Sequence, residues 1–569
     1  MAKGVVRTFL SRYVARYKGM ALASLGLMLV VALARMAPAY ILKVAIDRFI
    51  SRDDLHGLSV AALFYLAFTC LEYGAIYLQV YVTQLFGQSV IRDMRLGTYT
   101  HLLRLPVPYF DRTPLGKNLH YVTSDMENIN EFITSGIVTT AGDILTIIGI
   151  LAVMLYLSMP LTAVVILFFL FLAPAVNLFR KRFHKAYQHS RESVSQMNAF
   201  MGESLAGIYV SKAFHRREEE IARFRERNGA YMTAFKRVIF YLSLYFPFVE
   251  SVGILSILAI LWAGGYAVSL GAVTFGTIVA FIEYSHKLYN PIRDLSEKYN
   301  VYQNAFSSLE KLHTLHMTQG EGQTGAAGEG EVGGDIELRD VWLSYDGDDV
   351  YALKHINLKI KEGERIGIVG LTGSGKTSLI NLLLGFYRPT KGEVFVGGRP
   401  LTEYSLESIR RAFGIVSQDV YIFPRTIREN LFAAGGALHP GLDRLIKGFS
   451  REGSEKMVAE EGLNLSEGEK QLIAIGRIIT YRPRYLILDE ATSRIDRHLE
   501  AQVRAIIEGE FRAATWLVIA HRISTMVEMD RIIVIHNGEV AEEGSHRELL
   551  ERQGIYHHLY DIYREGGRL

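Results

Sequence analysis

A glycine-rich loop in the second half of the chain constrains the fold more than any other feature. A short apolar run at residues 366–369 is typical of a buried strand. It leads into G-L-T-G-S-G-K-T at residues 370–377, and the apolar residues from Leu379 onward indicate a helix. Glycines let successive backbone N–H groups turn toward a phosphate, and the helix N-terminus adds partial positive charge. Lys376 is expected to reach the β- and γ-phosphates and the Thr377 hydroxyl to ligate Mg²⁺, so the stretch predicts a nucleotide-phosphate site.

Long apolar stretches fill the first half of the chain. Hydrophobic residues make up 49% of the 569 residues and charged residues 21%, which is apolar for a soluble protein but ordinary for a half-membrane one. About 20 consecutive apolar residues suffice for a helix to cross a bilayer. Six candidate spans lie at residues 20–46, 60–85, 133–157, 161–179, 238–263 and 275–289, the last of them short. Their number and length argue against buried helices of a soluble protein.

The distribution of basic residues predicts the orientation of these spans. Lys and Arg cluster before the first span, after the second and fourth, and before the fifth, whereas residues 158–160 and 264–274 carry none. Arg48 and Arg52, after the first span, run against this pattern. By the positive-inside rule we expect a multi-pass protein of the inner (cytoplasmic) membrane with both termini cytoplasmic. The basic, amphipathic N-terminus is expected to be an interfacial helix rather than a signal peptide.

Net charge and cysteine content exclude two further features. The formal net charge of +3 is too small to suggest a nucleic-acid partner. Cys70 is the single cysteine, so the chain has no intramolecular disulfide.

The spacing between spans predicts long cytoplasmic extensions. Residues 86–132 and 180–237 separate spans two and three and spans four and five, and both segments are typical of polar helices. Spans two to five are therefore expected to continue as long helices beyond the membrane. Turns near residues 114–118 and 205–214 would meet the domain beneath.

Ionisable residues inside the spans are a candidate substrate pathway. Such groups are unfavourable in lipid and are expected to face the bundle interior or a watery cavity. Glu283 and His286 lie three residues apart and can pair on one helical face, and Glu250 belongs to the fifth span. The alternative is pairing between helices without ligand contact, as also for Arg35, Glu72 and Asp143, and the sequence leaves both open.

A change in composition marks the domain boundary. Residues 292–316 are typical of a helix leaving the membrane, and residues 317–334 form a Gly-rich linker. The sequence thus predicts an α-helical transmembrane domain at residues 1–316 and an α/β nucleotide-binding domain at residues 335–569.

Five residues of this second domain complete a candidate site. Tyr345 precedes the loop and could stack on an adenine, and Gln418 follows an apolar strand and could reach Mg²⁺ or water. Asp489 and Glu490 end the apolar run that starts at residue 485. Asp489 is placed to hold Mg²⁺ and Glu490 is the candidate general base. His521 follows another apolar strand and can donate to a γ-phosphate oxygen. The alternative for each is a solvated strand end.

These residues resemble the nucleotide-binding domain of ATP-binding-cassette (ABC) transporters. In this resemblance Tyr345 is the A-loop, residues 370–377 are the Walker A motif, and residues 493–496 are the D-loop. The six spans with long extensions resemble the exporter branch, an α-helical six-span domain followed by a P-loop NTPase domain. The resemblance implies ATP and Mg²⁺ as cofactors and a dimer in which each ATP lies between one chain's Walker A motif and the other's signature sequence.

The resemblance also assigns roles to individual residues. The implied ATP-binding residues are Tyr345, Gly370, Thr372, Gly373, Ser374, Gly375, Lys376, Thr377 and Ser378. The implied catalytic residues are Glu490, His521 and Gln418, and the implied metal ligands are Thr377, Gln418 and Asp489.

The signature sequence departs from the family pattern. The family usually has LSGGQ, whereas residues 465–469 here are LSEGE. Ser466 and Gly468 remain to approach the partner's ATP, but Glu467 and Glu469 replace Gly and Gln. A carboxylate near a triphosphate is electrostatically unfavourable. The departure predicts an asymmetric heterodimer with a second half-transporter, and a homodimer that tolerates the acidic signature is the alternative.

The resulting expectation is an ATP-hydrolysing exporter subunit. Its substrate would be an amphipathic small molecule, lipid or peptide, moved out of the cytoplasm or inner leaflet by alternating access. Two other classes remain: an ATP-gated channel or regulator with little turnover, and an ATP-dependent importer. The fusion of spans and ATPase on one chain argues against the importer, and Glu490 and His521 argue against the regulator.

Overall fold

The protein divides into two compact units, each described here by itself. The structure is a computed structural model that describes residues 11–293, 295–321, 331–431, 439–489, 497–519 and 526–566. The helical unit comprises Met1–Leu103 and Leu115–Thr318, and the sheet unit comprises Arg104–Pro114 and Gln319–Leu569. The chain thus contributes one short segment of its first half to the sheet unit.

Helices of 6 to 53 residues build the helical unit. They are α2 (Lys18–Val44), α3 (Leu55–Leu102), α5 (Leu115–Val122), α6 (Ser124–Glu131), α7 (Thr139–Leu157), α8 (Met159–Ala206), α9 (Ile208–Ala213), α10 (Arg217–Ser269), α11 (Phe275–Arg293) and α12 (Leu295–Met317). A π-helical stretch, η4 (Phe132–Val138), joins α6 to α7, and another, η2 (Ala45–Phe49), follows α2.

Five helical segments in the described part of the chain are long and apolar enough to cross a membrane. They are Ser11–Arg52, Leu55–Leu102, Leu115–Leu157, Met159–Ala206 and Arg217–Ser269. The sixth candidate span falls in α11, which has 19 residues and is not among these five. A count of six therefore stays a prediction.

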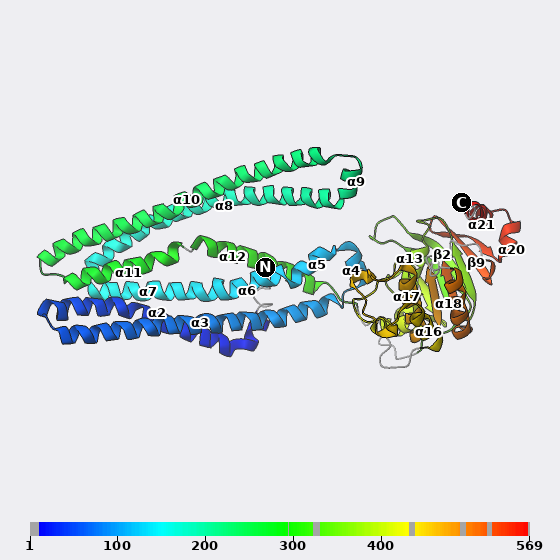
Figure 1. The fold of residues 1–569 in the computed structure, drawn as a ribbon, viewed down its shortest axis with the longest axis horizontal. Helices are drawn as coiled ribbons and strands as arrows, with labels where there is room; N and C mark the ends of the chain where they lie inside the picture. Colours follow the sequence, from blue (N-terminus) through cyan, green and yellow to red (C-terminus); the bar gives the residue numbers. More distant parts are fainter. Residues whose placement is uncertain are drawn as a thin grey trace. The chain divides into compact units, whose positions relative to one another are not determined.

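The segments that were predicted to extend spans two to five are helical. The 53 residues of α10 would extend about 80 Å at 1.5 Å per residue, well beyond the roughly 30 Å of a hydrocarbon core. Before the third span the chain is segmented into α5, α6 and η4 rather than forming one regular helix. Within the helical unit, α8 and α10 run together and diverge from the other helices toward the end that carries α9 (Figure 1).

The core of the helical unit gathers around α11. Phe281, Tyr284 and Leu288 are fully buried there against Ile150 of α7 and Ile260 of α10. The Tyr284 hydroxyl donates to the Met36 carbonyl oxygen of α2 at 2.8 Å. One face of α11 is thus apolar and buried. The polar residues of α11 lower its hydropathy, so it does not count among the five membrane-length segments.

Two sheets form the framework of the sheet unit. Among the described residues, one sheet has the order β2-β1-β4-β5 and the other the order β10-β9-β3-β8-β7-β6. The strands are β1 (Ile336–Leu343), β2 (Leu353–Ile360), β3 (Arg365–Val369), β4 (Lys391–Val396), β5 (Arg399–Pro400), β6 (Phe413–Val416), β7 (Tyr485–Asp489), β8 (Thr515–Ile519), β9 (Arg531–His536) and β10 (Glu539–Gly544). The first sheet is antiparallel, and β9, β3, β8, β7 and β6 are parallel.

Helices and the antiparallel sheet cover the two faces of the parallel sheet. The helices of this unit are α4 (Val107–Arg112), α13 (Lys376–Leu383), α14 (Leu406–Ala412), α15 (Ile427–Asn430), α16 (Pro440–Phe449), α17 (Glu467–Tyr481), α18 (Arg497–Glu510), α20 (His546–Glu551) and α21 (Ile555–Gly566). Along β7, Ile487 packs toward the antiparallel sheet and α13, whereas Leu486 and Leu488 pack toward α17 and α18. Strands buried on both faces are continuous apolar runs, which explains the composition of β7 and β8.

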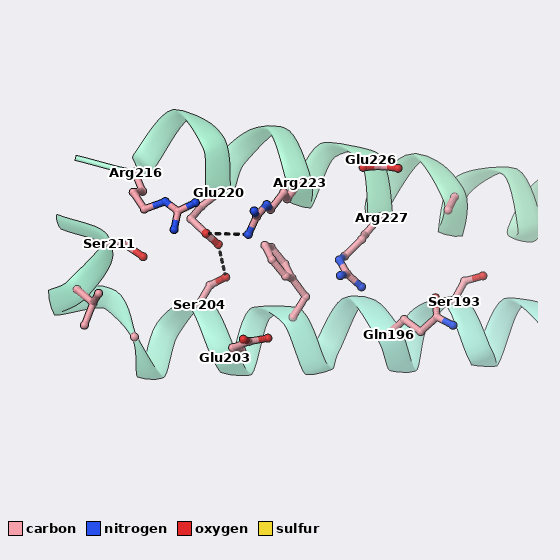
Figure 2. A pocket seen from close by; sticks show the side chains of 14 residues that line it. Ser193, Gln196, Glu203, Ser204, Ser211, Arg216, Glu220, Arg223, Glu226 and Arg227 are labelled. Atoms are coloured by element: carbon pink, nitrogen blue, oxygen red, sulfur yellow. Dashed lines mark hydrogen bonds and ion pairs between the residues drawn. The ribbon is translucent and has the colours of Figure 1, made fainter. Parts of the chain in front are cut away.

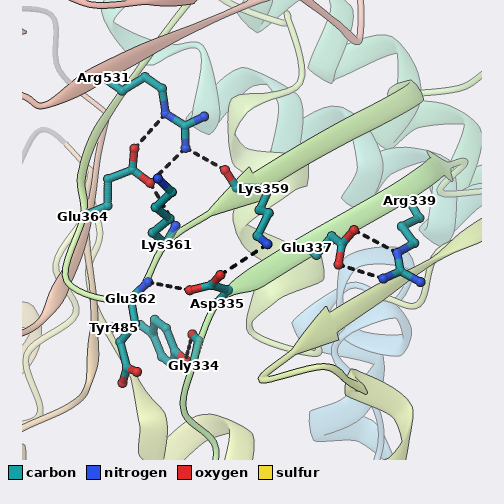
Figure 3. Close-up of polar contacts among 10 residues, drawn as sticks. All are labelled: Gly334, Asp335, Glu337, Arg339, Lys359, Lys361, Glu362, Glu364, Tyr485 and Arg531. Atoms are coloured by element: carbon teal, nitrogen blue, oxygen red, sulfur yellow. Dashed lines mark hydrogen bonds and ion pairs between the residues drawn. The ribbon is translucent and has the colours of Figure 1, made fainter.

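A polar network anchors the start of the sheet unit to its core. The buried Tyr485 donates its hydroxyl to the Gly334 carbonyl oxygen at 2.7 Å, and the backbone N–H of Glu362 donates to Asp335 at 3.1 Å (Figure 3). Arg531 of β9 donates to both carboxylate oxygens of Glu364 at 2.8 and 2.9 Å. These contacts fix where the chain enters the sheet unit.

Candidate functional site

The residues predicted to bind the nucleotide follow strands that end at the same edge of the parallel sheet. The register pairs Ile368 of β3 and Asp489 of β7 with Ile519 of β8, and Val416 of β6 with Leu488 of β7. Ligands of open α/β sheets bind beyond the carboxyl ends of the strands. The glycine-rich loop, Gln418 and Asp489 therefore emerge at the edge where a ligand is expected.

Two of the predicted catalytic residues lie outside the described residues. Glu490 directly follows β7, and His521 comes two residues after the end of β8. The D-loop at residues 493–496 also lies outside them. In the sequence, Glu490, the D-loop and His521 all follow strands that end at this edge of the sheet. The roles of all three stay predictions.

The glycine-rich loop has the backbone that only glycine readily adopts. Gly373 and Gly375 have φ angles of 80° and 111°. A Cβ atom at Gly375 would lie 2.8 Å from the Ala352 carbonyl oxygen, so a larger residue would also clash. The Lys376 ammonium donates to the carbonyl oxygens of Gly370 at 2.8 Å and Leu371 at 3.0 Å. The predicted strand and helix on either side are β3 and α13.

A buried hydroxyl in the loop fits a phosphate. Ser374 is 5% exposed, and its Oγ atom has no hydrogen-bond partner among the described residues. Buried polar atoms are rarely left unsatisfied. A phosphate oxygen accepts from hydroxyl and backbone N–H groups, and the N-terminus of α13 adds a favourable dipole. The donor set of the loop therefore suits a phosphate.

Tyr345 lies against the helix that follows the loop. Its hydroxyl donates to Ser378 Oγ at 2.9 Å and accepts from the Asn381 amide at 3.4 Å. Its ring makes an edge contact with Tyr387, with centroids 4.7 Å apart and planes at 82°. The structure thus brings the predicted adenine-stacking residue to the loop. Asn381 and Tyr387 were missed because neither belongs to a recognisable sequence pattern.

A segment of the first half of the chain also reaches this region. Arg112 of α4 donates to the Tyr345 carbonyl oxygen and lies 3.4 Å from the Asp346 carboxylate. Asp111 accepts from the Tyr387 hydroxyl at 2.6 Å. The sequence placed the turn toward the soluble domain near residues 114–118, whereas the segment in the sheet unit ends at Pro114.

The donor set for a metal consists of oxygen atoms. Thr377, Gln418 and Asp489 offer a hydroxyl, an amide and a carboxylate, which are the ligand types that Mg²⁺ prefers. Among the described residues no group of three or more His, Cys, Asp or Glu side chains could hold a metal ion. Few side-chain ligands are typical of Mg²⁺ sites that share the ion with phosphates.

The signature sequence forms the capped start of α17. The Ser466 hydroxyl accepts from the Glu469 N–H at 3.3 Å, and the Glu469 carboxylate accepts from the Ser466 N–H at 2.6 Å, which is a capping box. Glu467 forms an ion pair with Lys470 at 3.0 Å. Both unusual carboxylates therefore have partners within the signature helix. The sequence analysis missed the cap, although S-x-x-E at residues 466–469 is the capping-box pattern.

The proposed pathway residues lie on exposed faces of the helical unit. Glu250 of α10 and Glu283 and His286 of α11 are exposed, and the described contacts include no ion pair between Glu283 and His286. In contrast, the other ionisable residues within the spans have partners. Arg35 donates to Glu72 at 3.3 Å, and Asp143 pairs with Lys298 of α12.

A polar cavity of about 950 Å³ lies elsewhere, between the ends of α8 and α10 next to α9. Figure 2 shows Glu220 between Ser204 and Arg223, with contacts of 3.0 and 3.7 Å. Arg227 lies over the Phe200 ring at 4.9 Å. The charged residues that line the cavity are Glu203, Glu220, Glu226, Arg216, Arg223 and Arg227. Three acidic and three basic side chains line the cavity, so their net formal charge is zero.

Comparison with known proteins agrees with this geometry. Residues 22–292 match the family model described as ABC transporter transmembrane region, and residues 353–493 match that described as ABC transporter. The ABC transporter ATP-binding protein YfiC of Bacillus subtilis is 31% identical over 578 residues, which cover 98% of this chain and 94% of the relative. The ATP-dependent lipid A-core flippase of Desulfotalea psychrophila is 30% identical over 94% of this chain and 95% of the relative.

A solved structure shares the fold. It is that of a bacterial Atm1-family ABC exporter with ATP bound, with a TM-score of 0.78, 23% identity, and coverage of 96% of this chain and 98% of that chain. The residues predicted to bind nucleotide lie at one edge of the parallel sheet, the chain has membrane-length helices, and relatives match along nearly its whole length. Together these findings lead to one assignment. The chain belongs to the ABC transporter family, as an exporter-type half-transporter that works as a dimer and couples an ATPase to transport across a membrane.

Proposed function

We propose that the protein exports an amphipathic small molecule, lipid or peptide by alternating access. The observation that carries the proposal is the convergence of the glycine-rich loop, Tyr345, Gln418 and Asp489 at one end of the sheet unit, in a chain with membrane-length helices. ATP that binds the closed dimer more tightly than the open one would shift the population between inward- and outward-facing states. The names of the relatives, a lipid A-core flippase among them, support this substrate class.

Each residue predicted at the nucleotide site has a role in this proposal. Lys376 and the loop N–H groups bind the phosphates, and Tyr345 takes the adenine ring. Glu490 accepts a proton from the attacking water, and His521 donates to the γ-phosphate. Thr377, Gln418 and Asp489 would hold Mg²⁺. When bound, Mg²⁺ supplies positive charge against the β- and γ-phosphate oxygens.

We place the protein in the cytoplasmic membrane with six spans and both termini cytoplasmic. The distribution of Lys and Arg supports this orientation, and the buried face of α11 supports a sixth helix in the bundle. The exposed side chains of Glu250, Glu283 and His286 would face a pathway that the second half-transporter completes.

The acidic signature supports a heterodimer. Ser466 and Gly468 are kept for the partner's ATP, and two carboxylates accompany them. In a homodimer both ATP sites would include this signature, whereas in a heterodimer only one would. The productive site would contain Glu490 of this chain and a regular signature of the partner.

Replacement of Glu490 by Gln tests the catalytic assignment. Gln has the shape of Glu but cannot accept the proton, so hydrolysis in lipid nanodiscs should fall by about 10²-fold or more while ATP binding persists. Lys376→Ala should instead weaken ATP binding, because it removes phosphate contacts. Near-wild-type turnover of Glu490→Gln would refute the assignment.

Expression of the chain alone tests the heterodimer. Activity that appears only with a co-expressed second half-transporter, and that Glu490→Gln in this chain abolishes, would support it. A stable homodimer with brisk ATPase activity, slowed strongly by Ser466→Ala, would refute it.

A further inference from the structure

A cluster of polar side chains joins the N-terminal segment to α3. Asp93 of α3 lies between two guanidinium groups, because its Oδ2 atom is 3.1 Å from Arg16 and its Oδ1 atom is 3.2 Å from Arg92. Tyr17 donates its hydroxyl to Asp93 at 2.9 Å and accepts from Arg92 at 3.0 Å. Arg16 and Tyr17 belong to the short helix η1 (Ala15–Tyr17), which leads into α2. One carboxylate and one hydroxyl thus hold two arginines next to each other.

The carboxylate of this cluster is sheltered, whereas its two arginines are exposed. The Asp93 side chain is 16% exposed, and the side chains of Arg16 and Arg92 are 75% and 74% exposed. The two guanidinium groups share one carboxylate, so one positive charge of the cluster is not balanced within it. A guanidinium carries several N–H donors, which match the oxygen atoms of a phosphate. The arrangement therefore suits a phosphate group bound in front of both arginines.

The position of the cluster along α2 and α3 is that of the lipid headgroups. Leu22 of α2 and Leu85 of α3 are exposed apolar residues on membrane-length helices. Leu22 comes six residues after Arg16, and Leu85 comes seven residues before Arg92, which is roughly 10 Å along either helix. Headgroups form a layer of roughly 5–8 Å outside the hydrocarbon core, and an arginine side chain can extend along its helix toward that layer. Both helices thus indicate the same depth for the two arginines.

The sequence around the cluster is strongly basic. Arg12 and Lys18 are exposed and lie on either side of η1. Residues 11–20 and 88–94 contain four basic residues and one acidic residue, Asp93, so their net formal charge is +3. Basic residues next to a membrane attract anionic lipids. A contact that only fastened the N-terminal segment to α3 would need one arginine on Asp93, whereas this cluster has two.

We propose that Arg16 and Arg92, oriented by Asp93 and Tyr17, bind the phosphate of an anionic phospholipid headgroup. The lipid is a bound component of the surrounding membrane in this inference, and it is not the transported substrate. Its phosphate would bridge the N-terminal segment and α3 from the membrane surface.

Native mass spectrometry of the full chain tests the inference. The protein in a neutral detergent is titrated with phosphatidylglycerol, which is anionic, or with phosphatidylcholine, which has no net charge. Wild-type protein should bind phosphatidylglycerol more tightly than phosphatidylcholine. Arg16→Gln and Arg92→Gln should each weaken the tightest binding of phosphatidylglycerol by about fivefold, the contribution of one basic residue near a membrane surface. Binding of phosphatidylcholine should not change.

Three further variants separate a built site from general attraction. Arg225→Gln removes the same charge from an exposed position of α10 on the cytoplasmic side of the fifth candidate span, and should leave binding unchanged. Asp93→Asn adds positive charge, so general attraction would strengthen binding, whereas loss of the group that orients both arginines should weaken it. Tyr17→Phe removes the hydroxyl that contacts Arg92 without changing any charge, and should also weaken binding.

Four outcomes would overturn the inference. They are unchanged affinity in Arg16→Gln and Arg92→Gln, an equal loss in Arg225→Gln, tighter binding by Asp93→Asn, and binding of the water-soluble sn-glycerol 3-phosphate as tight as that of phosphatidylglycerol. The last would assign the cluster to a soluble phosphate compound. Each of these results would leave the proposed function standing, because the nucleotide site shares no residue with this cluster.

Discussion

Replacing Glu469 by Gln should keep both bonds of the capping box at the start of α17, whereas replacing it by Ala should remove the bond that the Glu469 side chain accepts. The Glu469 carboxylate accepts the Ser466 N–H at 2.6 Å, and Gln retains an oxygen that can accept the same bond. Ala loses this bond, and a net hydrogen bond typically contributes about 1 kcal/mol, while the Ser466 hydroxyl still accepts the N–H of residue 469. Both variants also lose a negative charge near the helix N-terminus, worth roughly 0.3–1 kcal/mol. The free energy of unfolding of Glu469→Ala should therefore be lower than that of Glu469→Gln by about 1 kcal/mol.

Thermal unfolding measures this difference. For a domain of the size of the sheet unit, about 1 kcal/mol corresponds to about 2–4 °C in Tm. In a Trp262→Phe background, the remaining Trp342 and Trp516 both lie in the sheet unit, so their fluorescence reports on that unit in nanodiscs. Glu467→Gln is the control, since its exposed ion pair with Lys470 is worth only about 0.2–1 kcal/mol. Equal Tm values for Glu469→Gln and Glu469→Ala would refute the capping role of the carboxylate.

Three further predictions concern other parts of the chain. Glu283→Gln should change which compounds stimulate the ATPase while Tm is retained; a lower Tm with an unchanged ligand profile would assign the residue a structural role. Burial lowers the pKa of His316 from 6.5 to about 4, so the unfolded chain binds more protons between these values. The stability of the helical unit should therefore fall as the pH is lowered through 6.5, and His316→Gln should flatten this dependence in Tm measurements. Tyr485→Phe should lower the Tm of the sheet unit by about 2–4 °C, because it loses the bond to Gly334, worth about 1 kcal/mol; an unchanged Tm would contradict this.

Local sequence patterns predicted individual strands and helices, because these depend on residues close together in the chain. The apolar run before the glycine-rich loop is β3, and the helix after it is α13. The five longest apolar segments are membrane-length helices, because the length of a helix and its apolar content are both visible in the sequence. The run that ends in Asp489 is β7, whose two buried faces require apolar residues throughout.

Contacts between distant segments could not be predicted in this way. Residues 104–114 belong to the sheet unit, where Arg104, Asp111 and Arg112 bond to residues distant in the sequence, and no sequence periodicity predicts such bonds. The same holds for Asn381 and Tyr387, which have no motif of their own. The pairing of Glu283 with His286 was suggested by helical spacing, but spacing does not show which way a face points, and both side chains are exposed.

The acidic signature shows how local pairing changes an electrostatic argument. From the sequence, two carboxylates near a partner's triphosphate are simply unfavourable. In the structure, the Glu469 carboxylate accepts the Ser466 N–H, and the Lys470 ammonium lies 3.0 Å from the Glu467 carboxylate, so one of the two negative charges has a positive charge beside it. The exposed pair is screened by salt, whereas the cap is a short bond to the backbone. The remaining repulsion should therefore be smaller and more dependent on ionic strength than the sequence alone suggests. A homodimer of this chain would carry that repulsion at both ATP sites and a heterodimer at one, so the ATPase activity of a homodimer should depend more steeply on salt than that of a heterodimer.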